Sequence, residues 1–413
     1  MSYLDNANDQ ADLIIAQADF IDALAKRVSA LEQAAPPVDA PEPPVDVPEE
    51  PPVEEPPVDE GPGETPPVEQ PPVVTPPVTP SPPVIATGLQ AIINALKAAK
   101  GGEVIDVTGT MGDLNLSGIN PAHTVTIRGD ATFQRIYVAA NCSDIQFQGV
   151  KAAHPIGKTQ PVVQSEGKRI VFDDVKVWGA PDADDYMAWS QKDWTDRKRA
   201  GIMLNGPDNI LQGSEVLGTY MAVALKGVRS MAIGNDILGI SGDGTRAIGN
   251  YTVVADNLIS DFVKIDNNHD DGGQSWVTSG GVVVGVEYLR NTISAHVEPN
   301  HPLASAIQGI GFFNGPYAEC RFIGNDMTVG ARHGITVYAM QSGEVSGNFV
   351  RHWKGARNTS GITVRSGSPI KIADNVSDFI DAAGQTPTGT MNLDEAAGRG
   401  ITNAVQLAAY LAA

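Results

Sequence analysis

The stretches HGITVYAMQSGEVSGNFV (333–350) and SGITVRSGSPIKIADNVS (360–377) follow one pattern. Each has a Gly-Ile-Thr-Val run near its start, and each places an asparagine 15 residues after its first residue, at Asn348 and Asn375. Runs rich in β-branched residues favour strands. Two copies of a strand-and-asparagine pattern that lie 27 residues apart indicate an internal repeat.

Working outward from these stretches, five earlier segments match the strand run and four earlier asparagines match the asparagine position. They are AGIMLN (200–205), MAVALK (221–226), DGTRAI (243–248), DGGQSW (271–276) and SAIQGI (305–310), with Asn235, Asn257, Asn291 and Asn325. Both columns have spacings of 21 to 34 residues, which predicts a solenoid whose coils differ by loops inserted on one side. Inward Ile, Val and Phe would stack from coil to coil. The asparagines would occupy bends, where this residue tolerates left-handed backbone geometry.

Composition divides the 413-residue chain into parts. Of its 30 prolines, 20 lie within 36–84, and the same segment holds 11 Asp and Glu but no Lys or Arg. About half of the formal net charge of −21 is therefore local to this segment. Binding to nucleic acid or to an anionic membrane surface is disfavoured, because both need clustered Lys and Arg.

The first 35 residues predict a helix over 3–34. Ile14, Ile21 and Val28 recur every seven residues, and Leu24 and Leu31 supply the second position of a heptad. This pattern favours a short coiled coil, and so a homo-oligomer. The alternative is a single amphipathic helix that packs on another protein. We expect residues 1–35 to oligomerise or to attach the chain to a particle, because an isolated helix of this length is marginal in water.

The segment 36–84 repeats Pro-Pro-Val eight times between acidic residues. Consecutive prolines favour polyproline II, which rises roughly 3.1 Å per residue, so 49 residues could reach about 150 Å. We expect an extended stalk over 36–86. A ligand for SH3-like domains is the alternative reading.

The remainder, 87–413, begins with the helix-like GLQAIINALKAA at 88–99, followed by short strand patterns such as TVTIRG and DIQFQG. In this order of elements it resembles the right-handed parallel β-helix proteins of the pectate-lyase-like superfamily. The resemblance implies an all-β solenoid capped by the first helix. The apolar C-terminal NAVQLAAYLAA would close the other end, or would form a trimer helix.

The aligned segments predict a polar site on one face of the solenoid. The first residue of the aligned strand segments becomes polar at Asp243, Asp271 and His333. The residue three positions further along becomes polar at Arg246, Gln274 and Gln308. Neighbouring coils would bring Asp243 and Asp271 to within about 5 Å of each other.

Three interpretations of this site stay open. Two near carboxylates serve as acid and nucleophile in glycoside hydrolysis, with Asp243, Asp271, Arg246 and His333 as the catalytic candidates. We expect no cofactor and no metal site, but the carboxylates beside Asn267, Asn268 and His269 could instead bind Ca²⁺. The polar columns could also bond coil to coil, or bind sugar hydroxyls without chemistry.

A long polar insertion at 179–201 carries Tyr186, Trp189 and Trp194 among several aspartates. Aromatic rings stack on sugar rings, so an exposed loop of this kind predicts glycan binding, and its alternative is a lid whose tryptophans pack on the solenoid. Further candidate glycan-binding residues near the polar columns are His269, Gln274, Trp276, Gln308 and Trp353.

The start of the sequence shows no secretory signal pattern, no apolar run approaches 18 residues, and two cysteines give no disulfide framework. A helical foot, an acidic stalk and a β-helix together resemble a phage spike or fibre, including the head-spike fibres of gene transfer agents. This resemblance implies a protein made in the cytoplasm and displayed on a virion or phage-like particle. A particle protein would hold residues 1–35, and the β-helix would attach to capsular polysaccharide of the host. The alternatives are a polysaccharide lyase, epimerase or glycoside hydrolase on the same β-helix, and a purely structural decoration protein.

Overall fold

The computed structural model describes residues 83–413 apart from 279, 355, 357–358 and 413. The predicted helix at 3–34 and nearly all of the predicted stalk lie outside the described residues. The stalk prediction ends too late at its C-terminal side. Val84–Ala86 already form the first strand, β1, and Val84 pairs with Ile105.

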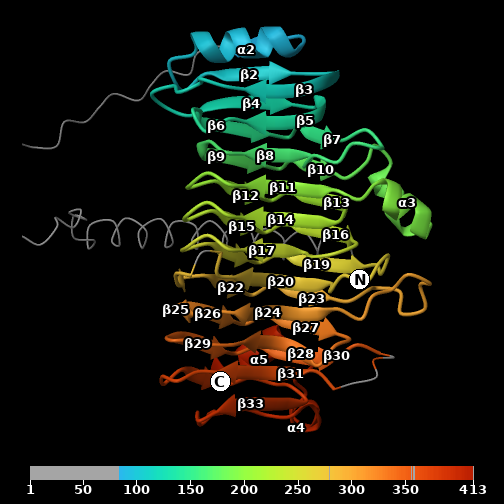
Figure 1. Cartoon of the computed structure of the whole chain (residues 1–413), viewed down its shortest axis with the longest axis vertical. Helices are drawn as coiled ribbons and strands as arrows, with labels where there is room; N and C mark the ends of the chain where they lie inside the picture. Colours follow the sequence, from blue (N-terminus) through green and yellow to red (C-terminus); the bar gives the residue numbers. More distant parts are fainter. Residues whose placement is uncertain (1–82, 279, 355, 357–358, 413) are drawn as a thin grey trace, which may run out of the picture. The chain divides into compact units, whose positions relative to one another are not determined.

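The described chain is a parallel β-helix, which confirms the predicted all-β, right-handed solenoid fold (Figure 1). Each coil contributes strands to three faces, and strands at the same position in successive coils pair in parallel. Face 1 is a 12-stranded sheet. Its strands, in stacking order, are β1 (Val84–Ala86), β2 (Val104–Val107), β4 (Val125–Gly129), β6 (Ser143–Gln148), β9 (Lys168–Asp173), β12 (Ile210–Gln212), β15 (Met231–Ile233), β18 (Val253–Ala255), β22 (Glu287–Leu289), β26 (Cys320–Ile323), β29 (Gly343–Ser346) and β32 (Lys371–Ala373).

Faces 2 and 3 belong to one 19-stranded sheet, because two long strands in the first coils, β3 (Thr110–Leu116) and β5 (Thr132–Val138), serve both. Face 2 continues with β7 (Lys151–Ala153), β10 (Lys176–Trp178), β13 (Glu215–Thr219), β16 (Asp236–Ile240), β19 (Leu258–Phe262), β23 (Thr292–Ser294), β27 (Asp326–Val329) and β30 (Phe349–His352). Face 3 continues with β8 (Val163–Ser165), β11 (Ala200–Leu204), β14 (Met221–Leu225), β17 (Thr245–Ala247), β20 (Asp271–Trp276), β24 (Gln308–Asn314), β28 (His333–Val337), β31 (Gly361–Arg365) and β33 (Phe379–Ala383). A small pair, β21 (Val283–Val284) and β25 (Tyr317–Ala318), lies apart from both sheets.

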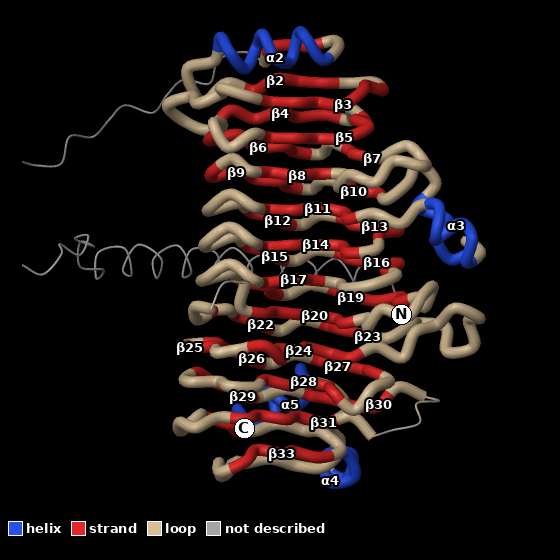
Figure 2. The backbone as a smooth tube through the Cα atoms, in the orientation of Figure 1, coloured by secondary structure: helices blue, strands red, loops and turns tan. Residues whose placement is uncertain are grey.

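Long loops interrupt the coils at the corner between face 2 and face 3. They are the insertion at 179–201, with η1 (Ala183–Ala188) and α3 (Gln191–Asp196), and the connections 263–270 and 295–307. Figures 1 and 2 show α3 and the loops that follow β19 and β23 projecting on the same side of the stacked coils. The prediction that loops are inserted on one side holds for these three connections, but another long connection, 277–286, which carries β21, lies at the corner between face 3 and face 1.

The interior of the solenoid is filled by Ile, Val, Leu and Phe side chains from all three faces. Strand side chains alternate between the two sides of a sheet, so every second residue faces inward. Equivalent inward positions then stack coil on coil. Phe147 and Phe172, for example, stack with ring centroids 5.0 Å apart.

The predicted asparagine column is a buried hydrogen-bond ladder between faces 1 and 2. The Nδ2 of Asn235 donates to the Oδ1 of Asn257 at 2.8 Å, and each asparagine below repeats this contact with the next, down to Asn375. The predicted reason for the asparagines, that they themselves adopt left-handed backbone geometry, is wrong. The left-handed backbone falls on the residue before each of them, such as Gly234 and Asp256, while the asparagine itself supplies the hydrogen bonds.

Helices pack at both ends of the described coils. Helix α2 (Leu89–Ala98) covers the first coil by burying Ile92 and Leu96 on one side. At the other end are α4 (Leu393–Gly398) and α5 (Ala404–Ala412). The Asp326 carboxylate on β27 accepts a hydrogen bond from the backbone of Ala404 at 3.0 Å. This contact sets α5 against face 2, so the C-terminal helix does not simply close the last coil.

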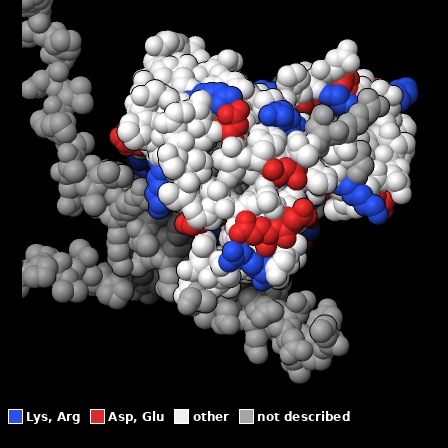
Figure 3. Space-filling model, turned by 90° about the horizontal axis from the view of Figure 1, so that it is seen from below, with Lys and Arg blue, Asp and Glu red and all other residues white. Residues whose placement is uncertain are grey.

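None of the helices in the described part of the chain is both long and apolar enough to span a bilayer. The end of the solenoid seen in Figure 3 shows mostly uncharged side chains, with acidic and basic groups close to one another. Cys142 and Cys320 are buried free thiols.

Candidate functional site

Asp243 and Asp271 lie on neighbouring coils at the corner between face 2 and face 3. Asp243 precedes β17 and Asp271 begins β20, and the Gly244 amide donates to the Asp271 carbonyl at 2.8 Å. The aligned columns predict this adjacency. Both side chains are covered, with Asp243 2% and Asp271 0% exposed.

Each carboxyl group is bonded to the polar residue three positions further along its own strand. The Asp243 Oδ2 lies 2.5 Å from the Arg246 Nη2, and the Asp271 Oδ2 accepts from the Gln274 Nε2 at 3.0 Å. Arg246 and Gln274 are register partners on β17 and β20, where their neighbours Thr245 and Ala247 point inward. The two carboxyl groups therefore lie on the outer side of face 3, beneath an arginine and a glutamine.

Asp270 is a third carboxyl group at the site, and the sequence analysis missed it. Its Oδ2 accepts a hydrogen bond from the Ser305 hydroxyl and lies 3.3 Å from the Lys264 Nζ. Strict alternation along a strand would send Asp270 to the opposite side from Asp271. The alternation does not apply to Asp270, because Asp270 is the last loop residue before β20. The Asp-Asp pair at a loop-to-strand junction was the signal available in the sequence.

Burial raises the pKa of Asp271 to about 7, and the charges of Asp243 and Asp270 add to this effect. Burial likewise raises the pKa of Asp270 to about 6, against the opposing Ser305 hydrogen bond and the Lys264 charge. The pKa of Asp243 is also raised by burial, while Arg246 favours its charged form. With a pKa of about 7, Asp271 is protonated below neutral pH and about half protonated at pH 7, whereas the Arg246 cation favours the ionised form of Asp243.

Three buried oxygens at the site accept no hydrogen bond from the described protein groups. They are the Oδ1 atoms of Asp243 and Asp271 and the Oε1 of Gln308. Buried polar atoms normally have a partner, and those that lack one within the protein are candidates for contact with a ligand.

The predicted alignment of Gln308 with Gln274 is wrong, because the observed strand register is shifted by three residues. Gln308 pairs with Asp271, and Gln274 pairs with Gly311. The physical reason is the long connection 295–307, which changes the length of this coil and leaves Ser305 before the strand. Since Ile310 pairs with Ile335, Gln308 and His333 occupy equivalent positions on successive coils.

His333 and His269 border the carboxyl groups of the site. The His333 Nδ1 lies 2.9 Å from the Thr336 Oγ1, and burial together with the Arg332 charge lowers the pKa of His333. His269 is exposed, and its Nδ1 is 3.4 Å from the Gln308 Nε2. A neutral His333 can act as a hydrogen-bond donor or acceptor for a ligand.

Two half-buried tryptophans lie in different directions from the carboxyl pair. The Trp276 ring centroid is 5.3 Å from the Arg246 guanidinium carbon, at the far end of β20. Beyond it is a hollow of about 260 Å³, lined in part by Lys226, Ile248 and Val277. Trp353 follows β30 at the same corner as Asp271, three coils further on, and packs partly against the core.

The predicted exposed aromatic surface of the 179–201 insertion is wrong. Tyr186, Trp189 and Trp194 are 9%, 5% and 1% exposed, and they form a small second core with Leu217, Val263 and Ile265. The Tyr186 hydroxyl donates to the Asp261 carboxylate at 2.6 Å. These rings therefore stabilise the insertion as a lid, which was the alternative interpretation.

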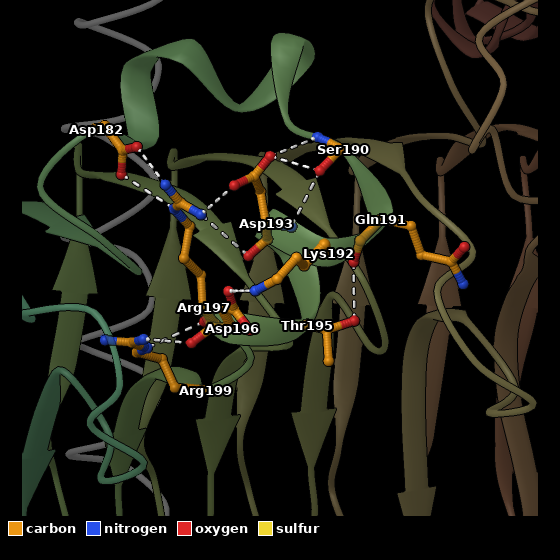
Figure 4. Close-up of polar contacts among 9 residues, drawn as sticks. All are labelled: Asp182, Ser190, Gln191, Lys192, Asp193, Thr195, Asp196, Arg197 and Arg199. Atoms are coloured by element: carbon orange, nitrogen blue, oxygen red, sulfur yellow. Dashed lines mark hydrogen bonds and ion pairs between the residues drawn. The ribbon is translucent and has the colours of Figure 1, made fainter.

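Ion pairs hold the polar side of the same insertion. Arg197 bridges Asp182 at 2.7 Å and Asp193 at 2.9 Å, and Ser190 caps α3, as Figure 4 shows. Most of the aspartates that suggested sugar hydroxyl binding are thus engaged within the insertion. Among the described residues, no group of three or more His, Cys, Asp or Glu side chains is arranged to hold a metal ion. Calcium binding near Asn267 and Asn268 stays a prediction.

No protein-family model matches the sequence, and no curated protein matches it either. Solved structures that resemble the chain include the pectate lyase Pel9A, which is 16% identical over 72% of this chain and 73% of that chain, with a TM-score of 0.41. The alginate lyase AlyGC of family PL6 is 13% identical over 75% of this chain and 53% of that chain, with a TM-score of 0.41. PfbA, a surface adhesin of Streptococcus pneumoniae, is 11% identical over 74% of this chain and 86% of that chain, with a TM-score of 0.42.

The stacked parallel sheets of the described chain define its class, a parallel β-helix, and a buried carboxyl cluster lies beneath its outer surface.

Proposed function

We propose that this β-helix hydrolyses a glycosidic bond of a polysaccharide, with Asp271 as the general acid and Asp243 as the second carboxylate. The observation that carries the proposal is the contrast between two adjacent buried carboxyl groups. Asp243 is paired with the Arg246 cation, and Asp271 is hydrogen-bonded to the neutral Gln274. Two carboxyl groups with separated pKa values are the pair that glycoside hydrolysis requires.

In the proposed reaction Asp271 donates its proton to the glycosidic oxygen as the bond to the anomeric carbon breaks. The Asp243 carboxylate attacks that carbon, and a water molecule later hydrolyses the glycosyl–enzyme ester while Asp271 accepts the proton. Parallel strands lie about 4.8 Å apart. This spacing is closer to the roughly 5 Å of retaining enzymes than to the wider gap of inverting enzymes, so we expect retention of configuration.

Arg246 would act in two ways, through its charge on Asp243 and through its contact with Trp276. It favours the charged form of Asp243 and lies against the ring of Trp276. A half-buried tryptophan offers a flat apolar surface to a sugar ring. The neighbouring hollow could take a further unit of the polymer.

We further propose that the site is displayed on a virion or phage-like particle, as the layout of the sequence suggests. The acidic Pro-Pro-Val segment at 36–84 would hold the β-helix away from the particle, and residues 1–35 would bind a particle protein and oligomerise. Capsular polysaccharide of a host cell would be the substrate. Linked copies of a weak sugar site gain avidity without better contacts.

Passive attachment to the same polysaccharide is the second candidate. It is favoured by the cover over the carboxyl groups, since Asp243 and Asp271 are at most 2% exposed and a catalytic carboxyl group must touch its substrate. In that case the outward Arg246, Gln274, Trp276 and His269 would bind sugar hydroxyls while the carboxyl groups only position them.

Incubation of the full chain with purified capsular polysaccharides tests both candidates. New reducing ends without absorbance of unsaturated uronates support hydrolysis, and new reducing ends with that absorbance support a lyase. Retained binding to unaltered polymer supports passive attachment, and no binding to any polymer contradicts both. Asp271→Asn should abolish cleavage, whereas the matched control Asp144→Asn removes an aspartate paired with Arg169 on a remote coil and should not.

A further inference from the structure

The insertion at 179–201 reaches both loops that carry the site aspartates, and it does so through Lys198. The Lys198 Nζ lies 2.6 Å from the Asp266 Oδ2, in the loop 263–270 that leads into Asp270 and Asp271. The same ammonium lies 4.0 Å from the ring centroid of Tyr220. One side chain thus contacts two separate coils.

The contact with Asp266 fixes the loop that ends at the site. Asp266 accepts from the Asn268 amide at 2.9 Å, and its pKa is lowered mainly by the hydrogen bond from Lys198. A second contact from the insertion supports it, because the Gln191 Nε2 donates to the Ile265 carbonyl at 2.9 Å. From Asp266 only four residues remain before Asp271, so displacement of the loop would move the carboxyl group.

The contact with Tyr220 reaches the other aspartate. A Cβ at Gly242 would come within 2.9 Å of the Tyr220 ring, so this ring packs directly on the backbone that precedes Asp243. The Asp243 carbonyl also accepts from the Ala222 amide, two residues after Tyr220, at 2.9 Å. The ring therefore sets the position of Gly242, and through it that of Asp243.

We infer that Lys198 is a positioning residue, which clamps the loop of Asp243 and the loop of Asp271 in one relative geometry. The inference deepens the proposed function and rests on it only for its effect on cleavage. A misplacement of about 1 Å at a catalytic group can reduce a rate about 100-fold, so loss of the clamp should reduce kcat by tenfold or more and leave KM nearly unchanged.

Lys198→Met in the full chain tests this inference, with Lys192→Met as the matched control. Lys192 lies in the same insertion and pairs with Asp196, four residues further along the same helix, at 2.5 Å. Hydrogen exchange followed by mass spectrometry should show faster exchange at 241–244 and 263–271 in Lys198→Met, but not in Lys192→Met. Lys198→Arg should restore protection, since it keeps the charge and the contact with an aromatic ring.

The pH profile adds a readout that a general loss of stability would not change. The charged groups with the largest effect on the pKa of the Asp271 carboxyl are Asp243, Asp270, Arg246 and Lys264, and Lys198 is not one of these four. Loss of Lys198 should therefore act by admitting water, which lowers the pKa of Asp271 and moves the alkaline limb of the cleavage profile to lower pH. Loss of a nearby cation acting directly would move it to higher pH.

The outcomes separate this inference from the proposed function. If the wild type cleaves no polysaccharide, hydrogen exchange still decides the role of Lys198. If the wild type cleaves and Lys198→Met matches Lys192→Met in exchange, rate and pH profile, the clamp is refuted while hydrolysis stands.

Discussion

The Arg246 guanidinium lies 2.5 Å from an Asp243 oxygen that is almost wholly covered by protein. Removing one partner of such a pair leaves a buried charge without compensation. The Asp271 carboxyl on the next coil avoids this problem below neutral pH by holding a proton, because burial raises its pKa to about 7. The site therefore stabilises one buried carboxyl group by an ion pair and the other by protonation.

Arg246→Met should lower the free energy of unfolding by about 3 kcal/mol at pH 7, the lower end of the range for a broken buried pair, because Arg246 is partly exposed. Urea denaturation measures this change. The control Arg128→Met breaks an exposed pair with Asp106, with side chains 48% and 33% exposed, and should cost less than about 1 kcal/mol. Equal losses in the two variants would mean that Asp243 does not depend on Arg246.

Asp271 should make stability fall as pH rises from about 4 to about 7. Its pKa is higher in the folded protein than in the unfolded chain, so the folded state binds more protons in this interval and loses stability as they are released. Asp271→Asn removes that penalty. The variant should be more stable than the wild type at pH 8 and should differ from it less at pH 5. Urea midpoints at the two pH values measure the difference, and parallel profiles would contradict the raised pKa.

Cleavage, if present, should fall on both sides of a pH optimum below about 7. Above that pH, Asp271 loses the proton that it must donate, and at lower pH Asp243 becomes protonated and can no longer attack. Initial rates of reducing-end release over pH 4–9 test this expectation. A rate that keeps rising above pH 8 would exclude Asp271 as the acid and would favour a lyase.

Asn291→Ala should destabilise the middle of the solenoid by about 3 kcal/mol, because it leaves buried donors and acceptors without partners on both sides. Asn291 accepts from the Asn257 Nδ2 at 2.9 Å and donates to the Asn325 Oδ1 at 3.0 Å. The control Asn120→Ala removes an exposed hydrogen bond to the Asn141 carbonyl and should cost less than about 1 kcal/mol. Thermal or urea unfolding compares the two variants.

Trp194→Ala and Trp276→Ala should have opposite phenotypes. Trp194 is 1% exposed, so its loss should destabilise the insertion by about 3–5 kcal/mol of local packing. Trp276 is half-buried beside Arg246, so its loss should weaken polysaccharide binding with little change in unfolding. Binding assays and limited proteolysis distinguish the effects. Weaker binding by a stably folded Trp194→Ala variant would restore the exposed-loop interpretation.

The sequence was sufficient for the features that repeat. The asparagine column and the pair Asp243 and Asp271 recur with the coil period, so one alignment places them on neighbouring coils. Gln308 was misplaced because the connection 295–307 changes the coil length without leaving a pattern in its own residues.

The alignment of repeated coils could not predict whether a single loop residue is buried. Trp189 and Trp194 have the composition of an exposed sugar-binding loop, and only the contacts with Leu217, Val263 and Ile265 from other coils show that they face inward. Asp270 was missed because strand alternation does not apply to the last residue of a loop. Lys198 acts through contacts with two distant coils, which no local pattern records.

The buried line of amides from Asn235 to Asn375 has a consequence for how such a chain can change in length. Every internal asparagine presents an amide oxygen acceptor to the asparagine of the preceding coil and an amide nitrogen donor to that of the following coil, so the surroundings of these rungs are interchangeable. Duplicating one whole turn would insert a rung that its neighbours already fit, whereas half a turn would break the line. The length of such a chain should therefore change by whole turns, while loops of varied length emerge at the corners between the faces.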